Sequence, residues 1–297
     1  LKAFRNEDFA LTLSLDGESI PATAYLIDRD RRIKLSPDGE GNFTHTFQKI
    51  QYDKSIRFEA AGYFSSEFDI RVVDRPDLKS FDVSLQYPAY LGRKNERLSN
   101  TGNLQVPEGT RIEWLFNTLA TDSLELVFNG EPVHEKLTES NDQVYGYKRE
   151  LSKTTDYEIR MFNEHGSNKD EVKYRVFVIK DAYPEIQLEQ YQDTTLFSFV
   201  AFRGSLQDDY GLSNLRLYYR LKNETDSYSS VPISISAQPN QRFYYQWDFD
   251  SLLYEQGATL EYYMRVWDND GVNGAKSTKT ATYTFKIPGE DEISDEI

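Results

Sequence analysis

The chain has 297 residues, which is enough for two or three domains that each bury their own core. Its 49 acidic and 34 basic residues give a net charge of −15, and this excludes nucleic-acid binding as a general role because a duplex would repel the chain. The absence of cysteine excludes disulfides, thiolate catalysis and cysteine-ligated zinc. Because the sequence begins with Leu1 rather than methionine, we expect it to be a segment of a longer protein.

Short runs in which apolar and polar residues alternate recur along the whole chain, and a period of two is the pattern of β-strands. In chain order the clearest runs are residues 9–15, 112–116, 215–219 and 243–247. No amphipathic helix of useful length is found, and turn dipeptides separate the runs: Asp16-Gly17, Asp38-Gly39, Asn129-Gly130 and Asp270-Gly271. This pattern predicts an all-β chain of immunoglobulin-like or fibronectin-III-like sandwiches.

The sequence divides into three similar units. Each unit ends in an apolar run that stops at a proline, and the three prolines, Pro76, Pro184 and Pro288, are almost evenly spaced. A proline cannot donate to a sheet, so it suits the end of a last strand and the start of a linker. We therefore predict three tandem sandwiches and an acidic tail, over residues 1–76, 77–183, 184–289 and 290–297.

A closer repeat lies upstream of the second and third of these prolines. Residues 156–166 align without gaps on residues 261–271, where an acid, a tyrosine, an arginine between apolar residues and a turn with glycine recur in order. Tyr157 and Tyr262 suit the tyrosine corner of an immunoglobulin-like fold, in which the ring packs inward and the hydroxyl bonds to the backbone of the corner. The first unit has Ile56 at this place, so its corner is expected to lack that bond.

Several segments resemble one known family. The string that starts at Glu261-Tyr262-Tyr263, continues through Trp267 to Gly274 and ends in Lys276-Ser277-Thr278 is similar to the third extracytoplasmic module of domain of unknown function 4175. The segments that resemble the second module, or the start of the third, are Tyr87-Pro88-Ala89-Tyr90-Leu91-Gly92, Thr101-Gly102, Val106-Pro107-Glu108-Gly109-Thr110 and Gln207-Asp208-Asp209-Tyr210-Gly211. The resemblance therefore extends over essentially the whole chain.

That family consists of large envelope proteins of Bacteroidota-type bacteria. The resemblance implies that the chain is the periplasmic or other extracytoplasmic part of a protein anchored by transmembrane helices before Leu1, and that a long charged helical region follows Ile297. The family has no established activity, so the resemblance supplies no catalytic, cofactor-binding or metal-binding residue. We expect an unidentified protein partner in the cell envelope, and we expect this segment by itself to be a monomer.

The three histidines do not suggest catalysis. His45 lies in the alternating strand Phe43-Thr44-His45-Thr46-Phe47, where we interpret it as out of phase with the two phenylalanines and therefore as facing solvent. His134 follows the Asn129-Gly130 turn, and His165 lies in a turn of its own. No partner motif of a nucleophilic site accompanies any of them, so we predict that the chain is not an enzyme.

Aspartates form one cluster that has two interpretations. Asp208 and Asp209 lie in one loop of the third unit and Asp268 and Asp270 in another, and both loops are expected at the same end of a sandwich. Oxygen ligands suit calcium, although the spacing is not that of an EF-hand. Aspartates also form turns by accepting bonds from nearby backbone, and we favour this interpretation because it explains both strings. Calcium binding stays open.

Aromatic residues are the other candidate for a binding site. Trp114 and Trp247 fall on core-facing positions of their strands, and Trp267 lies at a strand end. Alternating aromatics are typical of a sandwich core rather than of a platform for sugars. The runs 218–219 and 243–245 nevertheless place one ring on each face of a strand, so some tyrosines are exposed, and glycan binding stays open.

These observations predict a non-enzymatic spacer, scaffold or protein-interaction segment. The alternative is a ligand-binding module, for glycan or calcium, on the loops of the third unit. The linkers over residues 74–77 and 180–184 are short, and each contains a proline that restricts its backbone. We therefore predict that the three sandwiches stack end to end in an elongated rod.

Overall fold

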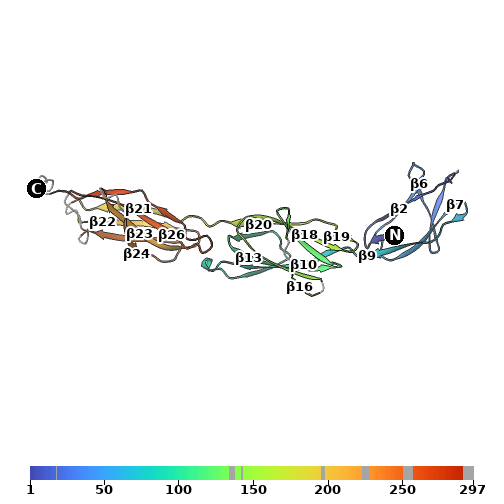
Figure 1. Cartoon of the computed structure of the whole chain (residues 1–297), viewed down its shortest axis with the longest axis horizontal. Coiled ribbons are helices and arrows are strands. Elements are labelled where there is room, and N and C mark those ends of the chain that lie inside the picture. The colour runs from blue at the N-terminus through green and yellow to red at the C-terminus, as the bar shows by residue number, and fades with distance from the viewer. Residues whose placement is uncertain are drawn as a thin grey trace.

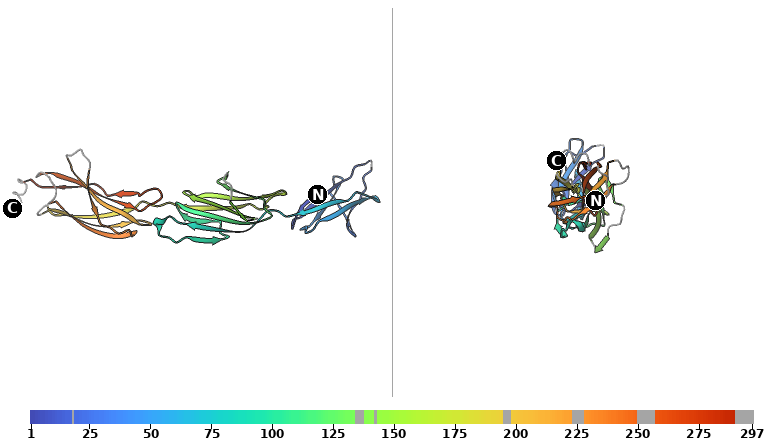
Figure 2. Two further views of the ribbon diagram at one scale, coloured as in Figure 1. Left: turned by 60° about the horizontal axis from the view of Figure 1, so that its bottom comes forward. Right: turned by 90° about the vertical axis from the view of Figure 1, so that its left-hand side faces the viewer.

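The computed structural model describes residues 1–17, 19–133, 138–141, 143–194, 198–222, 228–249 and 257–289. The elements in this part of the chain are β-strands and one short 3₁₀ helix, η1 (Ala89–Leu91). They form a row of three two-sheet units along one axis, with a narrow cross-section (Figures 1 and 2). The prediction of tandem sandwiches arranged as an elongated rod is confirmed. The predicted acidic tail, residues 290–297, lies outside the described residues, and within them no helix is long and apolar enough to cross a membrane.

The first sandwich contains strands β1 to β9. One sheet has the order β1-β9-β7-β3-β4, with β8 paired to β7, and the other has the order β2-β6-β5. Strand β1 runs parallel to β9, whereas β2 and β6 are antiparallel. The strands are β1 (Lys2–Phe4), β2 (Phe9–Ser14), β3 (Ala24–Asp28), β4 (Arg31–Lys34), β5 (Ser36–Pro37), β6 (Asn42–Phe47), β7 (Lys54–Ala60), β8 (Tyr63–Phe64) and β9 (Phe68–Val73).

The second sandwich contains strands β10 to β20. Its sheets have the orders β11-β10-β13-β17-β16 and β12-β20-β18-β14-β15, with β19 paired to β18. Strand β12 runs parallel to β20, as β1 does to β9 in the first sandwich. The strands are β10 (Asp77–Gln86), β11 (Glu96–Ser99), β12 (Leu104–Pro107), β13 (Thr110–Leu119), β14 (Ser123–Phe128), β15 (Glu131–Pro132), β16 (Thr138–Asn141), β17 (Val144–Leu151), β18 (Thr155–Asn163), β19 (Gly166–Ser167) and β20 (Val172–Ile179).

The third sandwich contains strands β21 to β28. Its sheets have the orders β21-β22-β25 and β24-β23-β26-β27, with β28 also paired to β26. The strands are β21 (Glu185–Gln192), β22 (Phe199–Gln207), β23 (Leu212–Leu221), β24 (Ser229–Ile233), β25 (Asn240–Asp248), β26 (Thr259–Asp268), β27 (Ser277–Lys279) and β28 (Tyr283–Lys286). The aligned segments of the sequence repeat fall on β18 and β26, which occupy the same place in their sandwiches.

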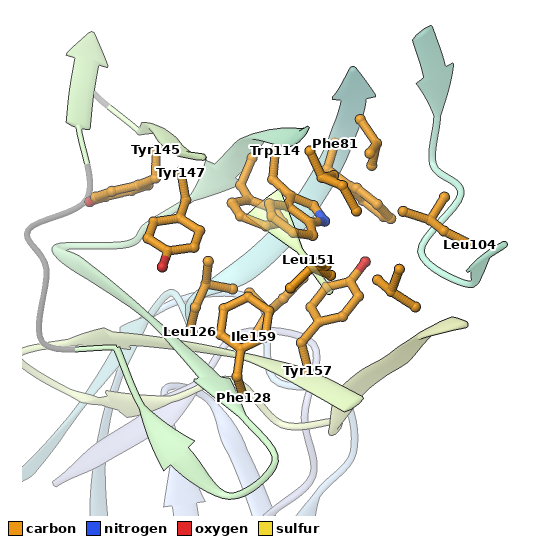
Figure 3. Close-up of a cluster of buried hydrophobic side chains, with 14 of the residues drawn as sticks. Phe81, Leu104, Trp114, Leu126, Phe128, Tyr145, Tyr147, Leu151, Tyr157 and Ile159 are labelled. Atoms are coloured by element: carbon orange, nitrogen blue, oxygen red, sulfur yellow. The ribbon is translucent and has the colours of Figure 1, made fainter. Parts of the chain in front are cut away.

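Each sandwich buries the alternate apolar residues of its strands between its two sheets. On β13 the side chains of Ile112, Trp114 and Phe116 are all 0% exposed, and they pack against rings from the facing sheet (Figure 3). Trp247 lies in the core of the third sandwich in the same way. The prediction that Trp114 and Trp247 face the core is confirmed, and Trp267 lies at the end of β26 as predicted.

The two tyrosines of the predicted corners are buried, but their hydroxyls do not bond to the corner backbone. The hydroxyl of Tyr157 donates to the carbonyl of Gly102 at 2.9 Å, and that of Tyr262 donates to Oε1 of Gln190 at 2.6 Å. The corner prediction was wrong in this respect because both rings point across the core. The hydroxyl of Tyr157 meets the connection between β11 and β12, and that of Tyr262 meets β21 of the facing sheet (Figure 3 shows Tyr157).

Candidate functional site at the junctions between the sandwiches

The predicted aspartate cluster lies at the end of the third sandwich that faces the second. Asp208 and Asp209 follow β22, Asp268 ends β26, and Asp270 lies in the turn after β26. The backbone N–H of Asn269 donates to the carbonyl of Gly211 at 3.0 Å and ties the two loops together. The structure therefore brings the two loops together as the sequence predicts.

Three of these aspartates form turns. One oxygen of Asp208 accepts the backbone N–H groups of Tyr210 and Gly211 at 2.9 and 2.8 Å. Asp268 accepts the N–H of Asp270 at 3.2 Å, and Asp270 in turn accepts two N–H groups of the residues that follow it. The turn-forming interpretation is therefore confirmed for these three residues, while the exposed Asp209 accepts only a long bond, at 3.3 Å, from the backbone of the preceding linker.

Lys276 lies among the same carboxylates. Its Nζ is 2.8 Å from Oδ2 of Asp270 and 2.9 Å from Oδ2 of Asp268. Both aspartate side chains are 0% exposed and the lysine side chain is 15% exposed, so the charges meet away from bulk water. In the described part of the chain, no group of three or more His, Asp or Glu side chains is arranged to hold a metal ion.

The same ammonium reaches across the linker between the second and third sandwiches. Its Nζ donates to Oδ1 of Asp181 at 2.5 Å, and the other oxygen of Asp181 accepts the hydroxyl of Tyr90 at 2.9 Å. Tyr90 belongs to η1 of the second sandwich, and its ring packs edge-on against Tyr210 of the third. One chain of polar contacts therefore joins the second sandwich, the linker and the third sandwich.

Burial and pairing act against each other in this cluster. Burial acts to lower the pKa of Lys276, but bonds to Asp181, Asp270 and Asp268 outweigh it and hold the pKa above its ordinary value. Burial likewise opposes ionisation of Asp270, yet bonds from Lys276 and the backbone leave its pKa lowered. For Asp181 and Asp208 burial dominates and the pKa is raised. The bonds to Lys276 thus favour the charged forms of Asp181 and Asp270 inside the junction.

Close backbone contact completes this junction. Gly109, in the turn between β12 and β13, has a φ of +76°, and a Cβ built there would lie 2.5 Å from Cγ2 of Val272 in the third sandwich. A Cβ on Gly271 would lie 3.2 Å from the ring of Tyr90. A side chain at Gly109 would be strained by the positive φ and would force Val272 to shift, whereas one at Gly271 would displace the ring of Tyr90 only slightly.

The first and second sandwiches meet through Arg75. Its guanidinium donates to both carboxylate oxygens of Glu7, at 2.6 and 3.2 Å, and to the carbonyl of Ser167 at 2.8 Å. It also lies 3.6 Å above the ring of Phe4, which is a cation–π distance. Glu7 and Phe4 belong to the first sandwich and Ser167 to the second, so this one side chain of the linker holds both.

The turns after β18 and β26 are equivalent in the sequence repeat, and both lie at a junction between sandwiches. Asn163 aligns with Asp268, and its Oδ1 accepts the N–H of His165 at 2.9 Å as Asp268 accepts that of Asp270. Its Nδ2 donates to the carbonyl of Asp74, in the preceding linker, at 2.9 Å. In both sandwiches this turn therefore contacts the linker that enters the unit.

Most segments that carry the family resemblance gather at the second junction. They are 87–92 with Tyr90, 106–110 with Gly109, 207–211 with the Asp208 turn, and the end of the 261–278 string with Lys276. Thr101-Gly102 lies elsewhere, at the hydroxyl of Tyr157. Sequence reasoning missed the roles of Lys276, Asp181 and Tyr90, because no local pattern relates residues that are so far apart in the chain.

The two histidines in the described part of the chain, His45 and His165, lie in different sandwiches and form no common site. The prediction that His45 faces solvent was wrong: a period of two places residues 43, 45 and 47 on one face of β6, and the ring of His45 packs edge-on against Phe47 at 4.7 Å. His45 is half-buried, and this burial lowers its pKa. His165 lies in the turn after β18 at the first junction, and His134 lies outside the described residues.

Tyrosines are exposed where the sequence places them on the outer face. Tyr244, between Phe243 and Tyr245 on β25, is 69% exposed. A larger aromatic group lies on β23 and β26, where the rings of Tyr218 and Tyr263 stack at 5.0 Å. Lys279 lies 5.5 Å from the ring of Tyr263, so neighbouring groups cover ring faces that a sugar would need for stacking.

No protein-family model matches the chain, and no curated protein matches it. The full ectodomain (Ig1–Ig3) of mouse nectin-like molecule 4 is 9% identical with a TM-score of 0.37, and the alignment covers 98% of this chain and 97% of that one. A marsupial T cell receptor is 10% identical with a TM-score of 0.36, covering 93% and 97%. Fibronectin(III)-like modules of CbhA from Clostridium thermocellum are 11% identical with a TM-score of 0.30, covering 60% and 89%. Likenesses this distant assign neither a family nor a function.

Proposed function

We propose that the chain is a stiff, non-enzymatic spacer or scaffold whose two junctions hold three sandwiches in line. The observation that carries this proposal is the contact of Lys276 with Asp181, whose other oxygen binds Tyr90. A flexible tether would need no side chains that join linker and sandwiches, and it would be rich in glycine and serine. Both linkers here are instead held by charged side chains from the sandwiches that flank them.

We also propose that this rod stands on the extracytoplasmic side of a membrane-anchored bacterial envelope protein, where it positions a protein partner. The support is the resemblance to domain of unknown function 4175, because most of the segments that carry it lie at the second junction. Crosslinking of the parent protein in cells, followed by mass spectrometry, tests this placement. Crosslinks to envelope proteins support it, and crosslinks confined to cytoplasmic proteins refute it.

Small-angle scattering of the chain tests the spacer function. The longest strands have ten residues, so each sandwich is about 34 Å long and three in line span about 100 Å. A rod of that length has a radius of gyration of about 29 Å, against about 19 Å for a compact globule of this size. A value near 19 Å would mean that the sandwiches fold back on one another, and it would refute the proposal.

Variants of the junction residues test whether these contacts keep the rod stiff. Lys276→Met and Arg75→Gln each remove the central cation of one junction and should broaden the distance distribution. Lys279→Met removes an exposed lysine at the end of β27, three residues after Lys276, and it should leave the distribution unchanged. Equal profiles for all the variants would show that the junction contacts do not set the shape.

A further inference from the structure

The outer face of the third sandwich carries a row of three cations. Alternate residues of β23 and β26 are buried in the core, so Arg216 and Arg265, which lie between them, point outward. The register places Arg216 opposite Arg265, and it places Arg265 opposite Lys279 of β27. Directly opposed side chains begin about 5 Å apart. Three neighbouring strands therefore hold one cation each at the same level of the sheet, and we call these three residues the cation row.

Like charges do not face each other elsewhere in this way. In the antiparallel ladders of the described residues, every other pair of directly opposed charged residues joins an acid to a base. Glu113 faces Lys148 in the second sandwich, and Arg220 faces Glu261 in the same ladder as the row. Opposed like charges destabilise a sheet, whereas opposed unlike charges stabilise it. The sequence has 49 acidic residues, yet both residues opposite Arg265 are basic.

No carboxylate of the described residues neutralises the cation row. The guanidinium of Arg216 donates to Oγ of Ser230 at 2.9 and 3.2 Å, and that of Arg265 donates to Oγ of Ser277 at 2.8 Å. Lys279 is exposed, and its ammonium lies near an aromatic ring rather than near an acid. Because serine hydroxyls and rings are neutral, the described part of the chain leaves the three positive charges uncompensated.

The serine bonds hold the two guanidinium groups in place and leave donors for a ligand. A guanidinium carries five N–H donors in a planar fork. The bonds to serine account for two of these donors on Arg216 and for one on Arg265. The planar fork matches the two oxygens of a carboxylate, and the ammonium of Lys279 binds an oxygen as a point charge. The cation row is therefore suited to bind carboxylates.

Aromatic rings lie beside the cation row. Cζ of Arg265 is 5.2 Å from the centre of the Trp267 ring, and Nζ of Lys279 is 5.5 Å from that of Tyr263. Tyr263 also stacks on Tyr218 at 5.0 Å. These contacts cover ring faces, so the surface offers N–H donors rather than open rings for sugars. Tryptophan, tyrosine and arginine contribute most to binding at protein interfaces, so this composition favours a protein ligand.

We propose that the cation row binds an acidic segment of a protein partner. The partner's carboxylates bind Arg216, Arg265 and Lys279, as acids bind the opposed bases in the other ladders. The net charge of −15 repels acidic proteins from most of the surface, so this face gives their binding a defined place. The inference rests on the proposed scaffold function for the class of partner, a protein, and on the row for the partner's charge.

Fluorescence anisotropy of a labelled peptide mixed with the full chain tests this inference. The probe peptide alternates glutamate with serine, and a peptide that alternates glutamine with serine is the uncharged control. Alternate side chains of an extended peptide lie about 7 Å apart on one face, a distance that the long side chains of the row can span. At low salt the chain should bind the glutamate peptide and not the glutamine peptide. Arg216→Gln together with Arg265→Gln should weaken binding of the glutamate peptide by about tenfold or more, because both guanidinium–carboxylate contacts are lost.

Two comparisons separate this site from general attraction. Arg203→Gln together with Arg242→Gln removes the same charge from two exposed arginines on the other sheet of this sandwich, and it should leave the affinity within about twofold. Lys279→Met should weaken binding by about threefold, and it decides the matter if the double variant of the row does not fold. The proposal is overturned by no binding of the glutamate peptide, by equal losses for the two arginine pairs, or by full affinity of Lys279→Met.

Three further outcomes would assign the cation row to another occupant and would also overturn the proposal. If removal of the acidic residues 290–297 raises the affinity for the peptide by about tenfold, this part of the same chain competes for the row. Tighter binding of an oligogalacturonate with the same number of carboxylates would show a sugar ligand, and concentration-dependent dimers that the double variant abolishes would show a second copy. Peptide binding by a chain that scatters as a compact globule would refute the spacer alone, and a rod that binds no peptide would refute only this inference.

Discussion

Replacement of Lys276 by methionine tests the central contact of the second junction. Methionine keeps much of the apolar length of the side chain but removes the ammonium, and the carboxylates of Asp181, Asp268 and Asp270, which are 3%, 0% and 0% exposed, lose their cation. Removal of one partner from a buried ion pair costs about 3–5 kcal/mol. Because the lysine side chain keeps 15% exposure, we expect the lower end, about 3 kcal/mol at pH 7.

The loss should depend on pH in a defined direction. Without the ammonium, burial should raise the pKa of Asp181 and of Asp270 in the folded variant above the value of about 3.9 in the unfolded chain. A raised folded pKa gives stability that is present below the unfolded pKa and is lost as the pH rises through the folded pKa. The deficit of Lys276→Met relative to the natural chain should therefore be larger at pH 7 than at pH 4. The natural chain itself keeps the contribution of Lys276 up to the ordinary lysine pKa, since its folded pKa is raised.

Urea unfolding measures this difference. Tryptophan fluorescence reports on the third sandwich through Trp247 and Trp267, and Lys279→Met serves as the matched control, with an expected loss below about 1 kcal/mol for its exposed contact with Tyr263. A loss for Lys276→Met below about 1 kcal/mol at pH 7 would refute the reasoning. Equal losses at pH 4 and pH 7 would refute the assigned cause, because packing alone does not titrate.

Three further changes test other parts of the structure. Tyr262→Phe removes a buried hydroxyl that donates to Gln190, and urea unfolding should show a loss of about 1–3 kcal/mol in the free energy of unfolding. Burial raises the pKa of this hydroxyl to about 12, so the natural chain loses stability between pH 10 and 12, and this loss should be weaker in the variant. Asp270→Ala should lower the free energy of unfolding by about 2 kcal/mol without calcium, since it removes bonds to Lys276 and to two backbone N–H groups. A loss of stability in calorimetry that appears only with calcium present would instead show a metal site. Gly109→Ala should lower the free energy of unfolding by about 1–2 kcal/mol, because residue 109 has a left-handed backbone conformation that alanine disfavours. The variant should also broaden the distance distribution from small-angle scattering, and adding Val272→Ala, which removes the nearest side-chain atoms, should reverse part of that broadening.

The fold was predictable because alternation of apolar residues is a local property. The period of two places Ile112, Trp114 and Phe116 on one face of β13 wherever the strand lies, and turn chemistry places Asp208 and Asp270 in turns. The same period placed His45 with Phe43 and Phe47, so the error there lay in the interpretation and not in the sequence.

The junctions were not predictable in the same way. Lys276 and Asp181 are 95 residues apart, and Arg75 and Ser167 are 92 apart. Such contacts depend on how whole units are oriented, and a single sequence carries no periodic signal for that. The gapless repeat that includes Asn163 and Asp268 was the nearest available sign, since Asn163 bonds to the first linker and Asp268 contacts the Lys276 that reaches the second.

The two junctions place their charges in opposite senses. At the first, the linker carries the cation, Arg75, and the preceding sandwich supplies Glu7. At the second, the linker carries the anion, Asp181, and the following sandwich supplies Lys276. A linker moved from one junction to the other would leave a buried charge unpaired, which is costly, so each junction accepts only its own neighbours. Both cations are part of the polypeptide and, unlike a bound metal ion, are not lost on dilution or chelation. The stiffness that we propose for the rod therefore rests on these two sets of charged contacts.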